Sequence, residues 1–146
     1  MAHYYIYLVS FKDTNDIYIG KTINNINGRL NQHKNDYNSA ISEYVKKKLN
    51  NNWDNVYIDI IDSIDANEDL THLINHPSNI SFISKRNKYV YPITHAKTNP
   101  DLIKAKLHIT ELFHIYNYYN EGKYKLINKV PTTHFNDNVY RFFYYT

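Results

Sequence analysis

The sequence predicts an α+β fold: a small, mainly antiparallel sheet of three or four strands, with helices packed on both sides. Two short β-branched and aromatic segments near the N-terminus are separated by a polar turn, which is the pattern of a β-hairpin. Helical spacing of apolar residues follows the hairpin, and a long apolar helix is expected in the second half of the chain. A chain of 146 residues, of which 42% are hydrophobic, suits one domain with a buried core.

The first half of the chain contains three expected strands and two expected helices. Residues 3–10 and 17–19 are the two strands of the hairpin, and the segment between them is rich in turn-forming residues. Helices are expected at 25–35 and 39–50, because apolar residues recur there at spacings of three and four. A third strand is expected at 56–61.

The second half carries the strongest helix signal. Asn99 is expected to cap a helix whose first turn holds Pro100, and the chain then stays apolar on all sides until shortly before Gly122. A helix that is apolar all round is typically buried in the centre of a protein. A short fourth strand is expected at 124–127. The tail at 135–145 is rich in aromatic residues, and those at 142–145 are expected to form a final packed strand or a dimer contact.

Residues 63–100, between these halves, show mixed patterns. We interpret them as an elaboration of a single domain that spans residues 1–146 and ends in an aromatic extension at 130–146. Three weak elements are expected in the elaboration: a short helix at 67–75 and strands at 80–84 and 89–91.

The composition excludes several chemistries. The chain has no cysteine, so disulfides, thiolate metal sites and cysteine nucleophiles are all excluded. The first residues lack the basic start and small-residue cleavage site of a signal peptide, and no apolar stretch approaches the roughly 18 residues of a membrane span. We therefore expect an intracellular protein without membrane contact. A net charge of +3 is only a weak indication of nucleic-acid binding.

Candidate functional groups gather around the predicted hairpin. Tyr7 and Tyr18 lie in its two strands, and Arg29 and His33 share one face of the following helix at a spacing of four residues. Each has a structural alternative, since tyrosines pack across strands, arginines pair with surface acids and histidines fill a core face. The chain has 16 tyrosines, so the functional interpretation depends on the joint spacing and not on any single residue.

Glu111 is the most informative residue outside the hairpin. It is expected on an apolar stripe, one helical turn from Leu107 and from Ile115. Burying an unpartnered carboxylate is costly, so Glu111 should be paired with a cation, protonated or bound to a metal. A salt bridge to a lysine or arginine is therefore the alternative to a metal site. Glu68 is a rival candidate, but it lies in a polar run without a buried helix.

Taken together, these segments resemble the GIY-YIG nuclease family. Residues 5–7 (Tyr-Ile-Tyr) occupy the first motif, with Tyr5 in place of its first glycine, and residues 18–20 (Tyr-Ile-Gly) occupy the second. The resemblance covers residues 4–62 and 101–129. The other matching positions are Lys21, Arg29 and His33, the lead-in to the third strand at 52–56, the glutamate helix at 111–117, and Asn128.

The resemblance implies a metal-dependent endonuclease that hydrolyses DNA phosphodiester bonds with one divalent metal, Mg²⁺ or Mn²⁺, held by Glu111. It implies Tyr7 as the general base and Arg29 as the group that stabilises phosphate charge. Because an ordinary tyrosine titrates near 10, Tyr7 can act as a base only if nearby cations lower its pKa, and Lys21, Arg29 and the metal are the groups that could do so. The supporting residues implied are Tyr18, Gly20, Lys21, His33 and Asn128.

Other interpretations remain open at this point. The chain could be a catalytically inactive nucleic-acid-binding module on the same scaffold, a nuclease that acts on RNA, or an interaction protein that uses its aromatic tail. The resemblance implies DNA as the partner and work such as viral or mobile-element DNA processing, while a monomer and a homodimer are equally compatible. Weaker site candidates are a zinc pair at His72 and His76, a backbone contact at 46–48 (Lys-Lys-Lys), and base stacking by the aromatic residues at 142–145.

Overall fold

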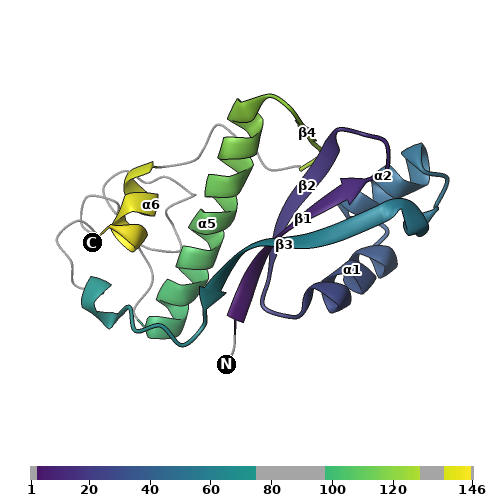
Figure 1. Ribbon diagram of the computed structural model, residues 1–146. Helices are drawn as coiled ribbons and strands as arrows, with labels where there is room; N and C mark the ends of the chain where they lie inside the picture. The colour runs from purple at the N-terminus through teal and green to yellow at the C-terminus, as the bar shows by residue number, and fades with distance from the viewer. Residues whose placement is uncertain (1–2, 75–97, 129–136, 146) are drawn as a thin grey trace.

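A four-stranded mixed sheet forms the centre of the protein (Figure 1). The computed structural model describes residues 3–74, 98–128 and 137–145. The strand order is β3-β1-β2-β4. β1 pairs antiparallel with β2 and with β3, while β4 pairs parallel with β2. The α+β class expected from the sequence is confirmed. The strands are β1 (His3–Phe11), β2 (Asp16–Thr22), β3 (Val56–Asp65) and β4 (Lys125–Leu126).

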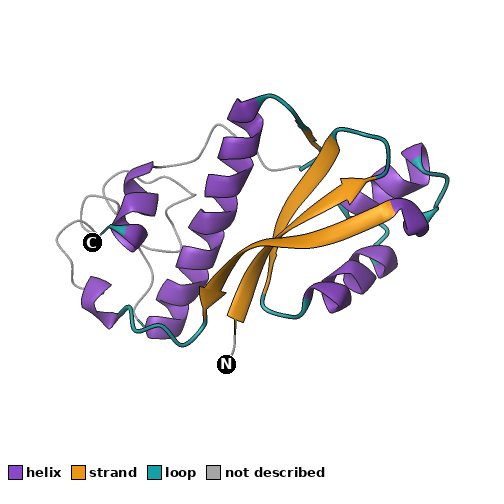
Figure 2. Ribbon diagram, in the orientation of Figure 1, coloured by secondary structure: helices purple, strands orange, loops and turns teal. Residues whose placement is uncertain are grey.

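Helices cover both faces of this sheet (Figure 2). The long helix α5 packs on one face of the sheet, with α6 on the far side of α5, and α1 and α2 pack on the other face. Two short 3₁₀ turns flank β3 in the sequence: η1 comes immediately before it and η2 follows it. The helices and turns are α1 (Ile26–Asn35), α2 (Ala40–Lys48), η1 (Trp53–Asn55), η2 (Thr71–Leu73), α5 (Asn99–Glu121) and α6 (Asp137–Tyr144).

The alternation of side chains along β1 and β2 creates two separate cores. Ile6 and Ile19 point into the core beneath α5, whereas Tyr7 and Val9 point into the core beneath α1 and α2. All four side chains are buried. Successive residues of a strand face opposite sides of a sheet, so the placement of Tyr7 on the α1 face follows from the placement of Ile6 on the α5 face.

The pairing of β1 with β3 changes register between Ile6 and Tyr7. Ile6 lies opposite Asp62, but Tyr7 lies opposite Ile60, so β3 contains one extra residue at this point. An extra residue bends a strand and increases its local twist, and such bulges are common beside functional sites. The irregularity in β3 therefore lies directly beside Tyr7.

The start of α5 differs from the sequence expectation. Thr98, and not Asn99, is the N-cap, because the Thr98 hydroxyl accepts a hydrogen bond from the backbone N–H of Asp101. The Asn99 side chain instead accepts from the N–H of Leu70 (2.7 Å) and donates to the carbonyl of Glu68 (2.8 Å). Asn99 was predicted wrongly as the cap because this contact joins segments about thirty residues apart. The expected end at Gly122 is confirmed, since Gly122 has a positive φ of 75°.

The aromatic tail forms a helix, so the expectation of a final strand was wrong. Phe142 and Phe143 of α6 are buried in the core against α5, and Tyr140 stacks on Phe113 with ring centroids 4.1 Å apart. Their burial also removes Phe142 and Phe143 as base-stacking candidates. Tyr140, Phe143 and Tyr144 recur at helical spacings of three and four residues and pack toward α5, so the aromatic residues of the tail are accommodated in a helix.

The short helix expected at 67–75 is reduced to the single turn η2. The strands expected at 80–84 and 89–91, and His76 of the zinc pair, lie outside the described residues. Within the described ranges, no helix has the length and apolar character needed to cross a membrane.

Candidate active site

Tyr7 is the buried centre of the candidate site. Its side chain has no solvent exposure, and in the antiparallel pair it lies opposite Gly20 of β2. The ring and hydroxyl of Tyr7 occupy the space that a β-carbon at Gly20 would need. Glycine at position 20 is therefore a steric requirement for Tyr7, which explains why the second motif ends in glycine.

Two side chains of α1 bind the Tyr7 hydroxyl. Its oxygen lies 2.8 Å from His33 Nε2 and 3.1 Å from Arg29 Nε. The guanidinium group can only donate, so the Tyr7 oxygen accepts from Arg29 and is free to donate its own hydrogen to His33. The four-residue spacing places Arg29 and His33 on one face of α1, as the sequence predicted. The asparagine N-cap of α1, Asn25, accepts from the N–H of Gly28 and helps to define the start of this helix.

Burial sets the protonation states of this group. Burial raises the pKa of Tyr7, with a further contribution from Tyr18, and Arg29 offsets only part of the rise. Burial and the positive charge of Arg29 lower the pKa of His33 to about 4. The lowered tyrosine pKa that a simple general base requires is therefore not found in the protein alone. At neutral pH the hydroxyl of Tyr7 is protonated and His33 is a neutral acceptor.

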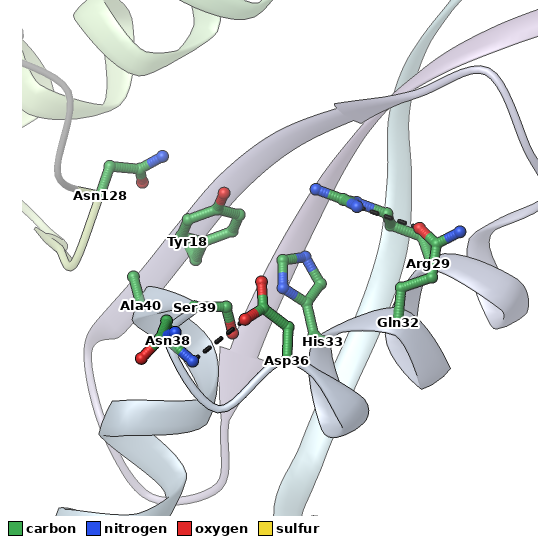
Figure 3. A pocket seen from close by; sticks show the side chains of 9 residues that line it. All are labelled: Tyr18, Arg29, Gln32, His33, Asp36, Asn38, Ser39, Ala40 and Asn128. Atoms are coloured by element: carbon green, nitrogen blue, oxygen red, sulfur yellow. Dashed lines mark hydrogen bonds between the residues drawn. The ribbon is translucent and has the colours of Figure 1, made fainter.

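Tyr18 and Arg29 border an open pocket next to this cluster (Figure 3). The pocket has a volume of about 400 Å³ and extends from Arg29 and His33 to Asn128. Arg29 donates from Nη1 to the side chain of Gln32 (3.0 Å). Among the described residues, Arg29 has no carboxylate partner within ion-pair distance, so the predicted alternative of a surface ion pair is not found there. Its guanidinium group lines the pocket, and its planar donor geometry matches carboxylate and phosphate oxygens.

Glu111 of α5 approaches the site from the other face of the sheet. Its side chain is nearly buried, and its Oε1 accepts a hydrogen bond from Lys21 Nζ at 3.2 Å. Burial raises the pKa of Glu111, and the charges of Lys21 and Arg29 act in the opposite direction. Burial raises the pKa of Tyr18, and the negative charge of Glu111 adds to that rise and makes a small further contribution to the raised pKa of Tyr7. Glu111 is therefore coupled electrostatically to the tyrosines and to Arg29.

The rival carboxylate, Glu68, lies elsewhere. Its Oε2 binds Lys106 Nζ at 2.7 Å, and the lysine side chain is only 9% exposed. This ion pair links the segment after β3 to α5, which gives Glu68 a structural role. Among the other weak candidates, His72 is exposed in η2, and Lys46, Lys47 and Lys48 form the last turn of α2.

Asn128 binds the backbone of β2. Its Oδ1 accepts from the N–H of Ile19 (3.0 Å), and its Nδ2 donates to the carbonyl of the same residue (2.6 Å). The amide thus pairs with the open edge of β2 as a neighbouring strand would. Ile19 follows Tyr18, so this contact holds the strand that carries the second tyrosine.

The sequence analysis missed His108. Its Nδ1 lies 3.4 Å from Lys21 Nζ, on the same side of α5 as Glu111, and burial lowers its pKa to about 4. Its spacing of three residues before Glu111 was a signal that the two side chains share one helix face. Within the described part of the chain, no group of three or more histidine, aspartate or glutamate residues is arranged to hold a metal.

The fold and the site define a class of protein: an α+β domain whose first hairpin carries paired tyrosines beside an arginine and a histidine. A family model described as the GIY-YIG catalytic domain matches residues 3–73. This match supports the resemblance of the chain to the GIY-YIG nuclease family. Searches among curated proteins and among solved structures found no significant match.

The family match includes only part of the site. It contains Tyr7, Tyr18, Arg29 and His33, whereas Glu111 and Asn128 lie beyond its last residue. These two residues are joined to the site by the packing of α5 on the sheet and by the hydrogen bonds to β2.

Proposed function

We propose that this protein is a metal-dependent endonuclease that hydrolyses DNA phosphodiester bonds. The observation that carries the proposal is the hydrogen-bonded group of Tyr7, His33 and Arg29 within a GIY-YIG catalytic domain. It combines a proton path with a guanidinium group at the border of an open pocket. Hydrolysis of a phosphodiester needs both of these functions.

In the proposed mechanism, Tyr7 is the general base through a relay. A neutral tyrosine can take a proton from an attacking water at its oxygen while its own hydrogen passes to His33 Nε2. This route does not require a tyrosinate, so it agrees with the raised pKa of the Tyr7 hydroxyl. His33 is neutral at physiological pH, so the lone pair on its Nε2 is available to the tyrosine hydrogen.

Arg29 binds and orients the phosphate in this scheme. Its Nε is used by Tyr7 and its Nη1 by Gln32, which leaves the outer edge of the planar group toward the pocket. A guanidinium group keeps its charge at any physiological pH and matches the geometry of phosphate oxygens. Tyr18, across the pocket, is placed to contact the bound strand, and Asn128 positions Tyr18 by holding β2.

The residues around Glu111 fit a divalent cation such as Mg²⁺ or Mn²⁺. A nearly buried carboxylate already faces a cation, the Lys21 ammonium group, and its Oε2 has no hydrogen-bond partner among the described residues. A metal held there by one carboxylate would supply charge stabilisation at the phosphate and at the leaving oxygen. Lys21, placed beside the same carboxylate, contributes a second positive charge for the phosphate.

A cleavage assay on supercoiled plasmid tests the proposal. The full chain should nick the plasmid with Mn²⁺ or Mg²⁺ and lose that activity in EDTA. Glu111→Gln should lose cleavage while it retains DNA binding in a gel-shift assay. Glu121→Gln is the matched control, because Glu121 lies on the same helix in an exposed pair with Lys123. No cleavage by the wild type with any divalent metal would overturn the proposal.

The Lys21–Glu111 ion pair also supports a second candidate, a catalytically inactive nucleic-acid-binding module. An ammonium group already neutralises the carboxylate, so the fold is complete without a metal. This candidate predicts gel-shift binding of DNA by both the wild type and Glu111→Gln, with no cleavage by either. A matched RNA substrate in the same assay distinguishes a nuclease directed at RNA from one directed at DNA.

A further inference from the structure

Three groups from two distant parts of the chain meet at one point on the α5 face of the sheet. The Lys21 ammonium nitrogen of β2 lies 3.2 Å from Glu111 Oε1 and 3.4 Å from His108 Nδ1. Lys21 and Ile19 share the α5 face of β2, and His108 and Glu111 are one helical turn apart on α5. The arrangement is fixed by the packing of the longest helix on the sheet.

The direction of these hydrogen bonds is determined by the lysine. An ammonium group has donors only, so both Glu111 Oε1 and His108 Nδ1 must present a lone pair to it. An imidazole nitrogen and a carboxylate oxygen therefore converge on one position that holds a positive charge. Both atom types are common ligands of divalent transition metals.

The lysine is the partner that is free to move. The side chain of Lys21 is 38% exposed, whereas that of Glu111 is 10% exposed. His108 and Glu111 extend from a helix whose neighbouring residues, Leu107 and Leu112, belong to the core. The two acceptors are thus held on a rigid element, while the long lysine chain reaches the same point from the solvent side.

We propose that His108 and Glu111 are a pair of metal ligands, and that the Lys21 ammonium group occupies the cation position until a metal replaces it. The inference rests on the proposed function, which requires a divalent metal at Glu111. It adds a second ligand from the protein and a competing internal cation. On replacement, Lys21 turns toward the solvent side, where its charge is available to a bound phosphate.

The second ligand predicts a preference among metals. Mg²⁺ takes oxygen ligands, whereas Mn²⁺ and Co²⁺ accept imidazole nitrogen as well. A site of carboxylate and imidazole should therefore favour Mn²⁺ over Mg²⁺ more strongly than a site with the carboxylate alone. The ratio of the two affinities is a signature that a purely structural role of His108 would not change.

Isothermal titration of the full chain with MnCl₂ and MgCl₂, without nucleic acid, tests the inference. His108→Ala should weaken Mn²⁺ binding by about tenfold or more and reduce the preference for Mn²⁺, in line with the usual effect of losing a metal-site group. Lys21→Met should strengthen Mn²⁺ binding, because the internal competitor is removed. The matched controls are His114→Ala and Lys123→Met, since His114 binds Asp62 and Lys123 binds Glu121 away from this point.

The outcomes separate this inference from the proposed function. If His108→Ala binds Mn²⁺ as tightly as the wild type, or if Lys21→Met binds it more weakly, the inference is overturned even when the protein cuts DNA. If the wild type binds Mn²⁺ through His108 and Glu111 but cuts no nucleic acid, the inference stands and the nuclease proposal is overturned. Absence of Mn²⁺ binding by both the wild type and Lys21→Met overturns the inference.

Discussion

The Tyr7 hydroxyl lies 2.8 Å from His33 Nε2, and both side chains are buried. Arg29 donates to the same hydroxyl, which directs the tyrosine hydrogen to the histidine. Because both the raised pKa of Tyr7 and the lowered pKa of His33 arise mainly from burial, the neutral pair is the stable state of the folded protein.

Removing the Tyr7 hydroxyl should stop the relay. Tyr7→Phe keeps the buried ring and should lower the plasmid cleavage rate by about 10²–10⁴-fold, the usual contribution of general acid–base catalysis. His33→Ala should lower it by a similar factor. The double variant should be no slower than Tyr7→Phe alone, because residues that act as one unit give non-additive effects. Additive losses, measured as initial rates under saturating metal, would show that the two residues act separately.

The lowered pKa of His33 predicts a loss of stability in acid. The unfolded histidine titrates near 6.5 and the folded one at about 4, so the unfolded state binds more protons between these values. Above about pH 6.5 this difference in proton binding costs the folded protein nothing. As the pH falls from 6.5 toward 4, the unfolded state takes up the proton first, and the free energy of unfolding decreases. Each pKa unit corresponds to about 1.4 kcal/mol, so the decline should reach a few kcal/mol.

Urea unfolding at several pH values measures this effect. His33→Gln cannot take up a proton, so its stability should fall less steeply than that of the wild type between pH 6.5 and pH 4. Equal slopes for the two proteins would contradict the assignment of a neutral, buried histidine. His72→Gln serves as the control, because His72 is exposed.

Gly20→Ala should damage the site through Tyr7. The added methyl group overlaps the Tyr7 ring, which is buried and held by two hydrogen bonds, so the ring or β2 must shift. We expect a loss of about 1–3 kcal/mol of stability, as for other overpacked cores, together with strongly reduced cleavage. Gly122→Ala is the matched control: it strains the positive φ of the α5 C-cap but has open space around it. It should lower stability and leave the activity per folded molecule unchanged.

Replacing Asn128 with aspartate should destabilise the protein more than replacing it with alanine. Asn128→Ala removes two hydrogen bonds to Ile19, which should cost about 1–3 kcal/mol. Asn128→Asp places a carboxylate oxygen against the Ile19 carbonyl, where the amide now donates, so the loss should be larger. Chemical denaturation of the three proteins at neutral pH gives the order directly. If the aspartate variant is as stable as the wild type, the two hydrogen bonds from Asn128 to Ile19 do not hold β2 in place.

Variants of Glu68 and Glu111 should have different effects, one on stability and the other on activity. Glu68→Gln should keep cleavage but lower stability by about 1–3 kcal/mol, because the buried Lys106 loses its charged partner. Glu111→Gln should abolish cleavage and Mn²⁺ binding. Thermal unfolding and plasmid nicking of both variants test the assignment. If only Glu68→Gln loses cleavage, the metal ligand is Glu68 and not Glu111.

Local patterns accounted for most of the secondary structure. The hairpin at β1 and β2, the two helices that follow and β3 were all predicted from spacings of two and of three to four residues. The helical spacing also put Arg29 and His33 on one face of α1, but the contact of His33 with Tyr7, 26 residues away, depends on the packing of α1 on the sheet. The cap of α5 and the helix in the tail were predicted wrongly, because distant contacts of Asn99 and Phe142 decided them.

By itself, the sequence determined the hairpin, the first two helices, β3 and the long helix α5, together with the side chains that share a face of each, because these depend on neighbours along the chain. Only the tertiary structure decided the pairing of Lys21 with Glu111, 90 residues away, and of Ile19 with Asn128, 109 residues away. It also decided the protonation states, since the pKa of Tyr7 and of His33 depends on how deeply packing buries each group. Burial and long-range contact arise from the way α5 and the sheet pack together, which no local pattern records.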